Sequence, residues 1–506
     1  MGNRRSLLRG ALMLTCVNLL LRFGSTSFQV WLSGRIGAAG IGLLQLVLSV
    51  NMLALTLGAA GGRMTVMYLC AEALGQGRRA DADRLLNGCF VYSIHCAGTV
   101  SGGLFLLAPG LAGEWIGSMD ALPALRTWAS FLPVICLTGV MTGNFTAANR
   151  IGTLAAVEVA EQLFSIGVTA VCLNFVAPGD RAVSCWAVVL GSCVGSVLTL
   201  GCLMLLYARS AGEGESRIPV AKPILRCALP LAVADDLKAG ISAVENLMVP
   251  RRLGLYAGVG DPLAAFGRVS GMVFPVLMFP AAILSSLAEV LIPELARCAA
   301  VGSRNRIRYL VRRNLRAALI YGLCCGGLLY LLSDTLCARL YPGEDIAYLL
   351  RRFAVLVPMI YCDLIADAMT RGLGEQAACA RYSVISNVLD VGLMYFLLPG
   401  FGIDGYFVSF ALTHGVNFAL SLRRILKIGG VRASRLFPAL SLGAAALGVI
   451  GGRCFVGAAQ KIAGFLGIFF GICFYTGAFG RGDIRWLRGL FFHIEKTTIT
   501  ADATNG

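Results

Sequence analysis

Four basic side chains stand inside apolar stretches of this sequence, where a positive charge is costly. They are Arg22, Arg63, Lys238 and Arg268. At the centre of a bilayer, one charged side chain costs about 2.5–3.5 kcal/mol on a scale derived from membrane insertion. Guanidinium groups suit phosphate oxygens because their N–H donors form a matching fork. We therefore predict that these cations bind an anionic headgroup. Pairing with acids on other helices is the alternative, and Asp235 can neutralise Lys238.

Acidic side chains also fall in or near the apolar stretches, and some have the chemistry of an ion site. Asp235 and Asp236 stand in one stretch, and Asn387 precedes Asp390 by three residues in another. In a helix, that spacing lets Asn387 and Asp390 face one point. Carboxylate and amide oxygens suit a hard cation such as Na⁺, and carboxylates can relay protons. The sequence therefore predicts coupling to Na⁺ or H⁺, with acid–arginine pairing as the alternative.

Known catalytic patterns are absent from the sequence. It contains no GxSxG, HExxH or P-loop motif, and these are the arrangements that would indicate hydrolysis or nucleotide binding. We therefore predict that the chain is not an enzyme and has no catalytic residue. We expect no cofactor, and no metal other than Na⁺ at the ion-coupling residues. Transport would have to use an ion gradient, the membrane potential or the gradient of the substrate.

The composition indicates the elements that position these residues. Of 506 residues, 57% are hydrophobic and only 14% are charged, against about 25% charged in soluble proteins. Because a membrane helix needs about 20 mostly apolar residues, we predict an all-α integral membrane protein of about 14 transmembrane helices, with 12 to 14 as the range. The predicted spans are 7–33, 41–70, 85–108, 123–145, 153–176, 184–207, 227–249, 263–296, 314–332, 353–370, 382–398, 405–422, 436–452 and 462–480.

The distribution of basic residues predicts the orientation of these spans. With the N-terminus inside, the inside loops hold about three times as many Lys and Arg residues as the outside loops, which is the asymmetry that the positive-inside rule requires. This predicts a multi-pass protein of the cytoplasmic membrane with both termini in the cytoplasm. It also accounts for the net charge of +16 without nucleic acid as a partner.

A short internal similarity suggests a duplication. Arg35-Ile36-Gly37 follows the first span and Arg252-Leu253-Gly254 follows the seventh, each before a Gly-rich loop. Spans 1–6 and 7–12 would then form two parallel six-helix lobes around a central cleft, an arrangement in which transporters bind substrate between lobes. The predicted parts are an N-lobe (1–207), a cytoplasmic linker (208–226), a C-lobe (227–426), two additional helices (427–480), and a cytoplasmic surface helix with a tail (481–506).

Several segments resemble a known family. They are Ile36-Gly37-Ala38-Ala39-Gly40-Ile41-Gly42-Leu43-Leu44-Gln45-Leu46, Ala71-Glu72-Ala73-Leu74-Gly75, Val244-Glu245-Asn246-Leu247-Met248-Val249-Pro250-Arg251-Arg252-Leu253, and Phe279-Pro280 through Ile292-Pro293-Glu294-Leu295. Over residues 5–430 the chain resembles the stage V sporulation protein B-like polysaccharide flippases. These belong to the multidrug/oligosaccharidyl-lipid/polysaccharide superfamily and are related to the lipid II flippases.

The resemblance implies a two-lobe bundle with two extra helices. It implies translocation by alternating access of an undecaprenyl-pyrophosphate-linked cell-envelope precursor, either lipid II-like or another lipid-linked oligosaccharide, in peptidoglycan, polysaccharide or spore formation. The partners would be this lipid-linked glycan and the bilayer, and the protein would act as a monomer. Arg22, Arg63 and Arg268 match the family's cavity by span. The nearest equivalents of an ion site are Asp235 or Asp236, Asn387, Asp390 and Thr413.

Two other functions remain open. A cation-coupled multidrug or metabolite exporter could use the same fold, but the first span carries Arg22 and no acid, which does not suit cationic drugs. An integral-membrane glycosyltransferase or a non-transporting scaffold is a further alternative, and it lacks a cluster of catalytic residues in the loops.

Overall fold

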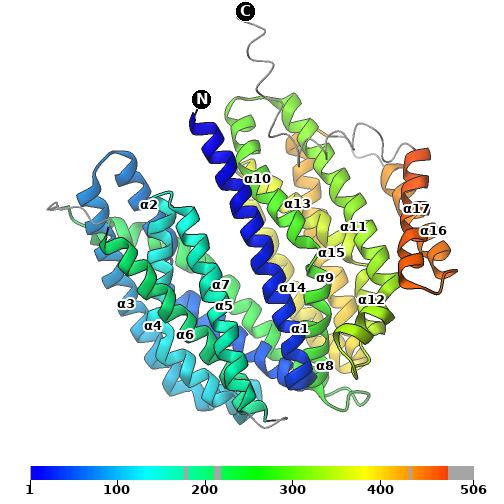
Figure 1. Cartoon of the computed structure of the whole chain (residues 1–506), viewed down its shortest axis with the longest axis horizontal. Helices are drawn as coiled ribbons and strands as arrows, with labels where there is room; N and C mark the ends of the chain where they lie inside the picture. The colour runs from blue at the N-terminus through cyan, green and yellow to red at the C-terminus, as the bar shows by residue number, and fades with distance from the viewer. Residues whose placement is uncertain (1, 176–179, 210–217, 432–435, 477–506) are drawn as a thin grey trace, which may run out of the picture. The chain divides into compact units, whose positions relative to one another are not determined.

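The described part of the chain is built from helices. The computed structural model describes residues 2–175, 180–209, 218–431 and 436–476, and these residues contain no β-strand (Figure 1). The predicted linker lies partly outside the described residues, and the predicted surface helix and tail lie wholly outside them. The prediction of an all-α protein is confirmed for the described residues.

Each predicted span coincides with one or more helices over its described residues. The helices are α1 (Gly2–Ala59), α2 (Gly62–Gly75), α3 (Arg79–Gly110), η1 (Leu111–Ile116), η2 (Met119–Ala121), α4 (Leu122–Ala147), α5 (Ile151–Asn174), α6 (Arg181–Ala208), α7 (Ala221–Leu253), α8 (Pro262–Phe266), η3 (Gly267–Val273), α9 (Phe274–Met278), α10 (Ala281–Ala300), α11 (Arg304–Leu340), α12 (Ala347–Ala354), α13 (Val357–Gly372), α14 (Gln376–Phe401), α15 (Ile403–Gly429), α16 (Leu436–Arg453) and α17 (Ala458–Tyr475).

The length and hydropathy of these helices are those of a membrane protein. Among the described residues, 8 helices are long and apolar enough to cross a bilayer, or up to 10 if each sharply bent pair forms one span. One of these segments, Leu19–Gly75, covers two of the predicted spans. The chain is therefore a multi-span helical membrane protein, and the number 14 stays a prediction.

Glycines produce the breaks between the first two predicted spans and inside the second. Gly37 has φ 72° and ψ 175° within α1, so the helix is interrupted there. Gly61, between α1 and α2, has φ 72° and faces the carbonyl oxygen of Ala228 at 2.7 Å from an ideal Cβ position. Both positions need the left-handed region that glycine adopts without steric cost. The breaks therefore follow from residues that the sequence already contains.

The described residues form two compact units. Unit 1 comprises residues 1–290, 340–344 and 376–417, and unit 2 comprises residues 291–339, 345–375 and 418–506. These boundaries differ from those of the predicted lobes, since each unit combines segments that are distant in the sequence. The two six-helix lobes stay a prediction.

Within unit 1, the second half of α1 packs against α8 and η3 by direct contact of their backbones. An ideal Cβ on Gly42 would lie 2.2 Å from the carbonyl oxygen of Leu263, and one on Gly267 would lie 2.0 Å from that of Ala38. Real Cβ atoms do not approach so closely, so only glycine fits at either position. Small residues are what allow membrane helices to approach to this distance.

Within unit 2, α16 and α17 form a hairpin that packs on α11 (Figure 1). The rings of Phe465 and Phe469 on α17 are stacked, with centroids 5.6 Å apart. Both rings are fully buried and pack with Ile320 and Leu323 of α11 and Ala444 of α16. This apolar contact fixes the middle parts of α11, α16 and α17 relative to one another.

Candidate functional site

A cavity of about 730 Å³ in unit 1 is the main candidate for a binding site. Ligand pockets in proteins usually have volumes of about 300–1,000 Å³. Its walls come from α1, η3, α9, the turn after α9, and the first half of α10. The lining residues are Leu19, Leu21, Arg22, Ser25, Thr26, Gln29, Gln45, Ser270, Phe274, Pro275, Met278, Phe279, Ala282, Ser285, Ser286 and Glu289.

One face of α1 supplies most of the polar wall. Arg22, Ser25, Thr26 and Gln29 are spaced by three, four or seven residues, so a helix places them on one side. The amide of Gln29 donates a 3.1 Å hydrogen bond to the carbonyl oxygen of Gly271 in η3. This bond fixes the polar face of α1 beside η3.

The wall formed by α9 and α10 combines apolar and polar parts. Phe274, Met278 and Phe279 line the cavity near α9, and the Phe279 ring lies 6.0 Å from that of Phe23 of α1. On α10, Ser285, Ser286 and Glu289 add hydroxyl groups and a carboxylate. A cavity whose lining combines a cation, hydroxyl groups and apolar side chains suits an amphiphile with an anionic head.

Arg22 is the cation of this cavity. It is the one basic side chain among the described residues that line the cavity. Its side chain is exposed, and no ion pair joins it to another described residue. Glu289 supplies the one carboxylate of the lining. The guanidinium donors of Arg22 are therefore available to bind a phosphate.

The other predicted cations are not in the lining of this cavity. Arg268, on η3, donates a 2.8 Å hydrogen bond from Nε to a carboxylate oxygen of Glu344, and both side chains are partly buried. Arg63, on α2, is exposed and lies close enough to Glu158 of α5 for an electrostatic interaction. Lys238, on α7, is exposed. The pairing of Arg268 with Glu344 matches the alternative in which the cations pair with acids on other helices. The substrate-binding role of Arg268, Arg63 and Lys238 stays a prediction.

The structure brings two of the predicted ion-coupling residues together. Asp390 of α14 is buried and accepts a 2.6 Å hydrogen bond from the hydroxyl of Ser409 on α15. The Thr413 hydroxyl, also buried, lies one turn further along α15 and is within hydrogen-bonding reach of Asp390. Glu245, on α7, lies close enough to Asp390 for the two carboxyl groups to interact electrostatically. His414 is close enough to Asp390 for an electrostatic interaction.

We name Glu245, Asp390, Ser409 and Thr413 the carboxyl cluster. Two ionised carboxylates that are close together away from water repel each other, and a bound cation or a proton would relieve that repulsion. With the two hydroxyl groups, the carboxyl cluster has the chemistry to hold one monovalent cation or one exchangeable proton.

The remaining predicted ion-coupling residues lie elsewhere on the same helices. Asp236 lies near Thr56 of α1, and its buried Oδ1 has no hydrogen-bond partner among the described residues. It precedes Glu245 by nine residues, which is about 13.5 Å of helix rise. Asp235 is exposed, and no hydrogen bond links Asn387 to the carboxyl cluster among the described residues. Their role in ion coupling stays a prediction.

Sequence reasoning did not assign several residues of both sites. In the cavity these are the hydroxyl and amide residues. In the carboxyl cluster they are Glu245 and Ser409, and His414 is a neighbour of the cluster. The helical spacing of Arg22, Ser25 and Gln29 was a signal that an apolar span has one polar face. No comparable sequence pattern predicts that Glu245 and Asp390 lie close together, because their contact depends on tertiary packing. The described residues contain no group of three or more His, Cys, Asp or Glu that could hold a metal ion.

Comparison with known proteins relates the chain to a group of membrane proteins. No model of a known protein family matches it. It is 23% identical over 424 residues to Stage V sporulation protein B of Bacillus subtilis (strain 168), covering 79% of this chain and 80% of that protein.

Solved structures show the same fold. The lipid II flippase MurJ in its inward closed conformation matches with a TM-score of 0.70 and 10% identity, over 91% of this chain and 98% of that one. An inward-facing multidrug resistance MATE family transporter of the MOP superfamily matches with a TM-score of 0.60 and 16% identity, over 83% of this chain and 100% of that one. The chain is therefore similar in sequence to Stage V sporulation protein B and has the fold seen in these solved structures.

Proposed function

We propose that this protein is a flippase that moves a lipid-linked, pyrophosphate-bearing cell-envelope precursor across the cytoplasmic membrane. The observation that carries the proposal is the cavity whose lining combines Arg22 with apolar side chains. The similarity in fold to the lipid II flippase MurJ supports the same class of substrate. The structural relatives are transporters rather than enzymes, and we assign no catalytic residue.

Binding of the headgroup follows from the groups in the cavity. The guanidinium of Arg22 neutralises a phosphate, and its N–H donors bind two oxygens at once. Ser25, Gln29 and Ser285 supply hydroxyl and amide groups for the remaining phosphate oxygens or the first sugar. Phe274 and Phe279 provide the apolar surface beside which the polyprenyl chain lies. Rocking of the two predicted lobes would then alternate access to the cavity.

The carboxyl cluster supplies the coupling ion. One proton held between Glu245 and Asp390 would remove the repulsion of their carboxylates, so we propose H⁺ as the coupling ion. Release of this proton would leave two negative charges in contact in a buried site, which is unfavourable. The three helices that meet there would then rearrange, and this links the ion to the conformation. Na⁺ held by the same oxygens is the other ion that the chemistry allows.

Neutral variants of the carboxyl cluster test this coupling. We expect Glu245→Gln and Asp390→Asn each to reduce stimulation of transport by a proton gradient by about tenfold, since coupling energies of 1–3 kcal/mol correspond to about 5- to 150-fold. The measurement is transport by proteoliposomes under imposed proton or Na⁺ gradients. Glu114→Gln, which removes an exposed carboxylate of η1, is the control. Stimulation by Na⁺ alone would contradict proton coupling.

The substrate class is tested by binding. Native mass spectrometry of the purified chain with an undecaprenyl-pyrophosphate-linked muropeptide should show a bound lipid, and the same lipid without its pyrophosphate should not bind. Undecaprenyl-pyrophosphate carrying a different glycan forms the third arm. Binding of both glycans would identify the pyrophosphate as the recognised group. If neither pyrophosphate lipid binds, the proposed substrate class is wrong.

A cation-coupled exporter of drugs or metabolites is the second candidate, and one observation favours it. Glu289 lines the same cavity, and a carboxylate is the group that a cationic solute would need. The similarity to a multidrug MATE transporter is consistent with this use. A fluorescent organic cation that is transported by the wild type and lost in Glu289→Gln, with Arg22→Ala unaffected, would favour the exporter.

The orientation in the membrane is also proposed. We infer from the Lys and Arg distribution that both termini are cytoplasmic and that the protein resides in the cytoplasmic membrane. We also propose that the protein is a monomer. Cysteine labelling from either side of intact cells, at positions in the predicted loops, tests the orientation.

A further inference from the structure

A second cavity, in unit 2, has basic side chains from three helices. Its volume is about 370 Å³, and its lining residues are Tyr330, Leu331, Asp334, Arg351, Arg453 and Lys461. They share no residue with the cavity around Arg22. Tyr330 and Asp334 lie near the end of α11, Arg351 is on α12, and Arg453 and Lys461 lie on either side of the turn between α16 and α17.

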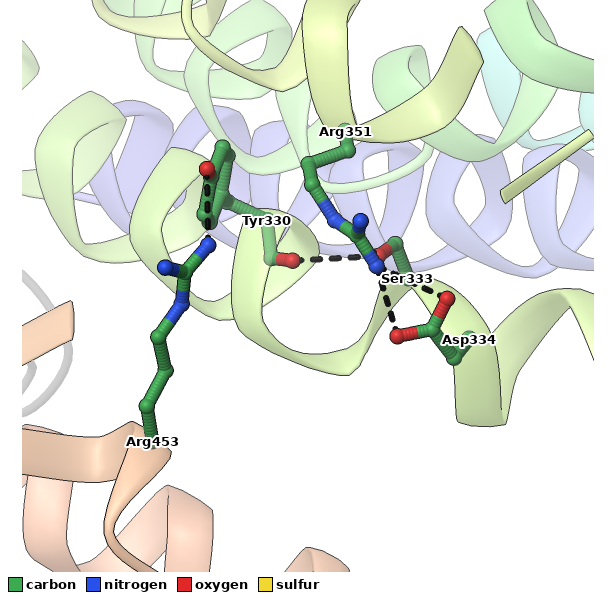
Figure 2. A network of polar contacts seen from close by, with 5 residues as sticks. All are labelled: Tyr330, Ser333, Asp334, Arg351 and Arg453. Atoms are coloured by element: carbon green, nitrogen blue, oxygen red, sulfur yellow. Dashed lines mark hydrogen bonds and ion pairs between the residues drawn. The ribbon is translucent and has the colours of Figure 1, made fainter. Parts of the chain in front are cut away.

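The side chains of this cavity are held in position by specific contacts. Arg351 donates hydrogen bonds of 2.6 and 2.7 Å to the two carboxylate oxygens of Asp334, and its Nε lies 3.2 Å from the buried hydroxyl of Ser333. Arg453 donates a 2.9 Å hydrogen bond to the hydroxyl of Tyr330. Figure 2 shows Arg351 and Arg453 approaching the same part of α11 from α12 and α16.

The charges in this cavity do not balance. Asp334 is its one acid among the described lining residues, and Arg351 already occupies both carboxylate oxygens. Arg453 and Lys461 form no ion pair with any residue that the structure describes. Two positive charges therefore remain without a counterion. Three like charges around one cavity repel each other, and a bound anion would remove that repulsion.

The geometry around Arg453 and Lys461 suits a phosphate. The guanidinium of Arg453 uses one nitrogen for the Tyr330 hydroxyl (Figure 2), which leaves donors for a second partner. Lys461 stands in the first turn of α17, where the helix dipole adds further positive potential. The rigid apolar contact among α11, α16 and α17 holds these groups in place.

The predicted orientation places this cavity at the outer surface of the membrane. Tyr330 follows an apolar run of α11, and aromatic residues concentrate at the membrane–water interface. The segments 333–352 and 453–461 are both predicted outside loops. Phosphate groups of lipids are present at that depth, so a lipid headgroup can reach the cavity without crossing the bilayer.

We propose that Arg453 and Lys461, with Tyr330 and Arg351, form a binding site for the phosphate group of a lipid in the outer leaflet. The phosphate is that of an anionic phospholipid or of a polyprenyl phosphate. The site is independent of the transport cavity, so it would bind lipid whether or not the protein is a flippase. An occupied site ties α16 and α17 to the end of α11 through one shared anion.

The test measures lipid binding to the full chain in nanodiscs or by native mass spectrometry. The probes are phosphatidylglycerol, undecaprenyl phosphate and, as the uncharged reference, phosphatidylcholine. We expect the double variant Arg453→Gln/Lys461→Gln to weaken binding of at least one anionic lipid by about tenfold or more, since hydrogen bonds to charged groups are stronger than those between neutral groups. Phosphatidylcholine binding should not change.

Two further variants make the result specific. Arg339→Gln removes an exposed arginine from α11 in the same unit and the same predicted outer segment, and we expect it to bind anionic lipids as the wild type does. Arg453→Lys keeps the charge and should retain most of the binding even if the double variant folds poorly. If the double variant loses binding of only phosphatidylglycerol, or of only undecaprenyl phosphate, the lost lipid is the source of the phosphate. Equal binding of both anionic lipids by the wild type and the double variant would overturn the proposal.

Discussion

Arg22→Ala is expected to abolish lipid transport while the amount of protein in the membrane stays unchanged. The lining of the cavity offers no second basic side chain among the described residues to replace Arg22. Two hydrogen bonds to phosphate are lost, each of about 1.5–3 kcal/mol, so the affinity for the substrate should fall by about 100-fold or more. Proteoliposomes that contain a fluorescent polyprenyl-pyrophosphate glycan measure this directly.

A series at the same position separates charge from geometry. Arg22→Lys keeps a positive charge but loses the planar fork, so we expect activity between that of the wild type and that of Arg22→Ala. Arg181→Ala removes an exposed arginine at the beginning of α6 and should have no effect. Lys238→Ala tests the other predicted cation, which does not line the cavity. Full transport by Arg22→Ala would show that the cavity does not bind the headgroup.

Gly267→Ala is expected to lower the stability of the protein strongly. The added Cβ would lie 2.0 Å from the carbonyl oxygen of Ala38 and 2.7 Å from the backbone nitrogen of Gly42. Neither atom can move without a shift of the whole helix. Overpacking a core usually costs about 1–3 kcal/mol, and a clash with backbone should reach or exceed the upper end. Thermal unfolding in detergent, followed by tryptophan fluorescence, provides the measurement.

A matched glycine supplies the control for this substitution. Gly98, in the middle of α3, has no atom within 4 Å of an ideal Cβ position. Since alanine is favoured over glycine in a helix by about 0.5–1 kcal/mol, Gly98→Ala should be neutral or slightly stabilising. Gly42→Ala, whose Cβ would lie 2.2 Å from the carbonyl oxygen of Leu263, should reproduce the effect of Gly267→Ala. An unchanged melting temperature in both variants would contradict the close contact of α1 with η3.

Helix positions were predictable from the sequence because an apolar stretch that crosses a membrane can adopt few conformations other than a helix. A backbone in lipid must satisfy its own hydrogen bonds, and the helix does so within one segment. The breaks inside segments were harder to predict. Gly61 stands in the middle of an apolar stretch that reads as one span, and only the close approach of the Ala228 carbonyl oxygen shows why the chain bends there.

The candidate sites were predictable in part. Arg22 was identified because a lone cation in an apolar stretch is costly wherever it faces lipid. Arg268 gave the same signal, yet the structure pairs it with Glu344, which is 76 residues away in the chain. The two arginines differ only in what the tertiary structure places beside them. Likewise, Glu245 and Asp390 meet because α7 packs on α14, and no spacing within either helix predicts that contact.

The π-helical turn η3 has a consequence for the length of the chain. It spans Gly267–Val273 and continues directly into α9, whose Phe274, Pro275 and Met278 face the cavity. A π-helical turn accommodates one residue more than an α-helical turn. Deleting one residue here would turn α9 by about 100° about its axis and carry those three side chains away from the cavity wall. The number of residues in this segment is therefore constrained as strongly as their types, and natural variation in length should fall in the loops instead.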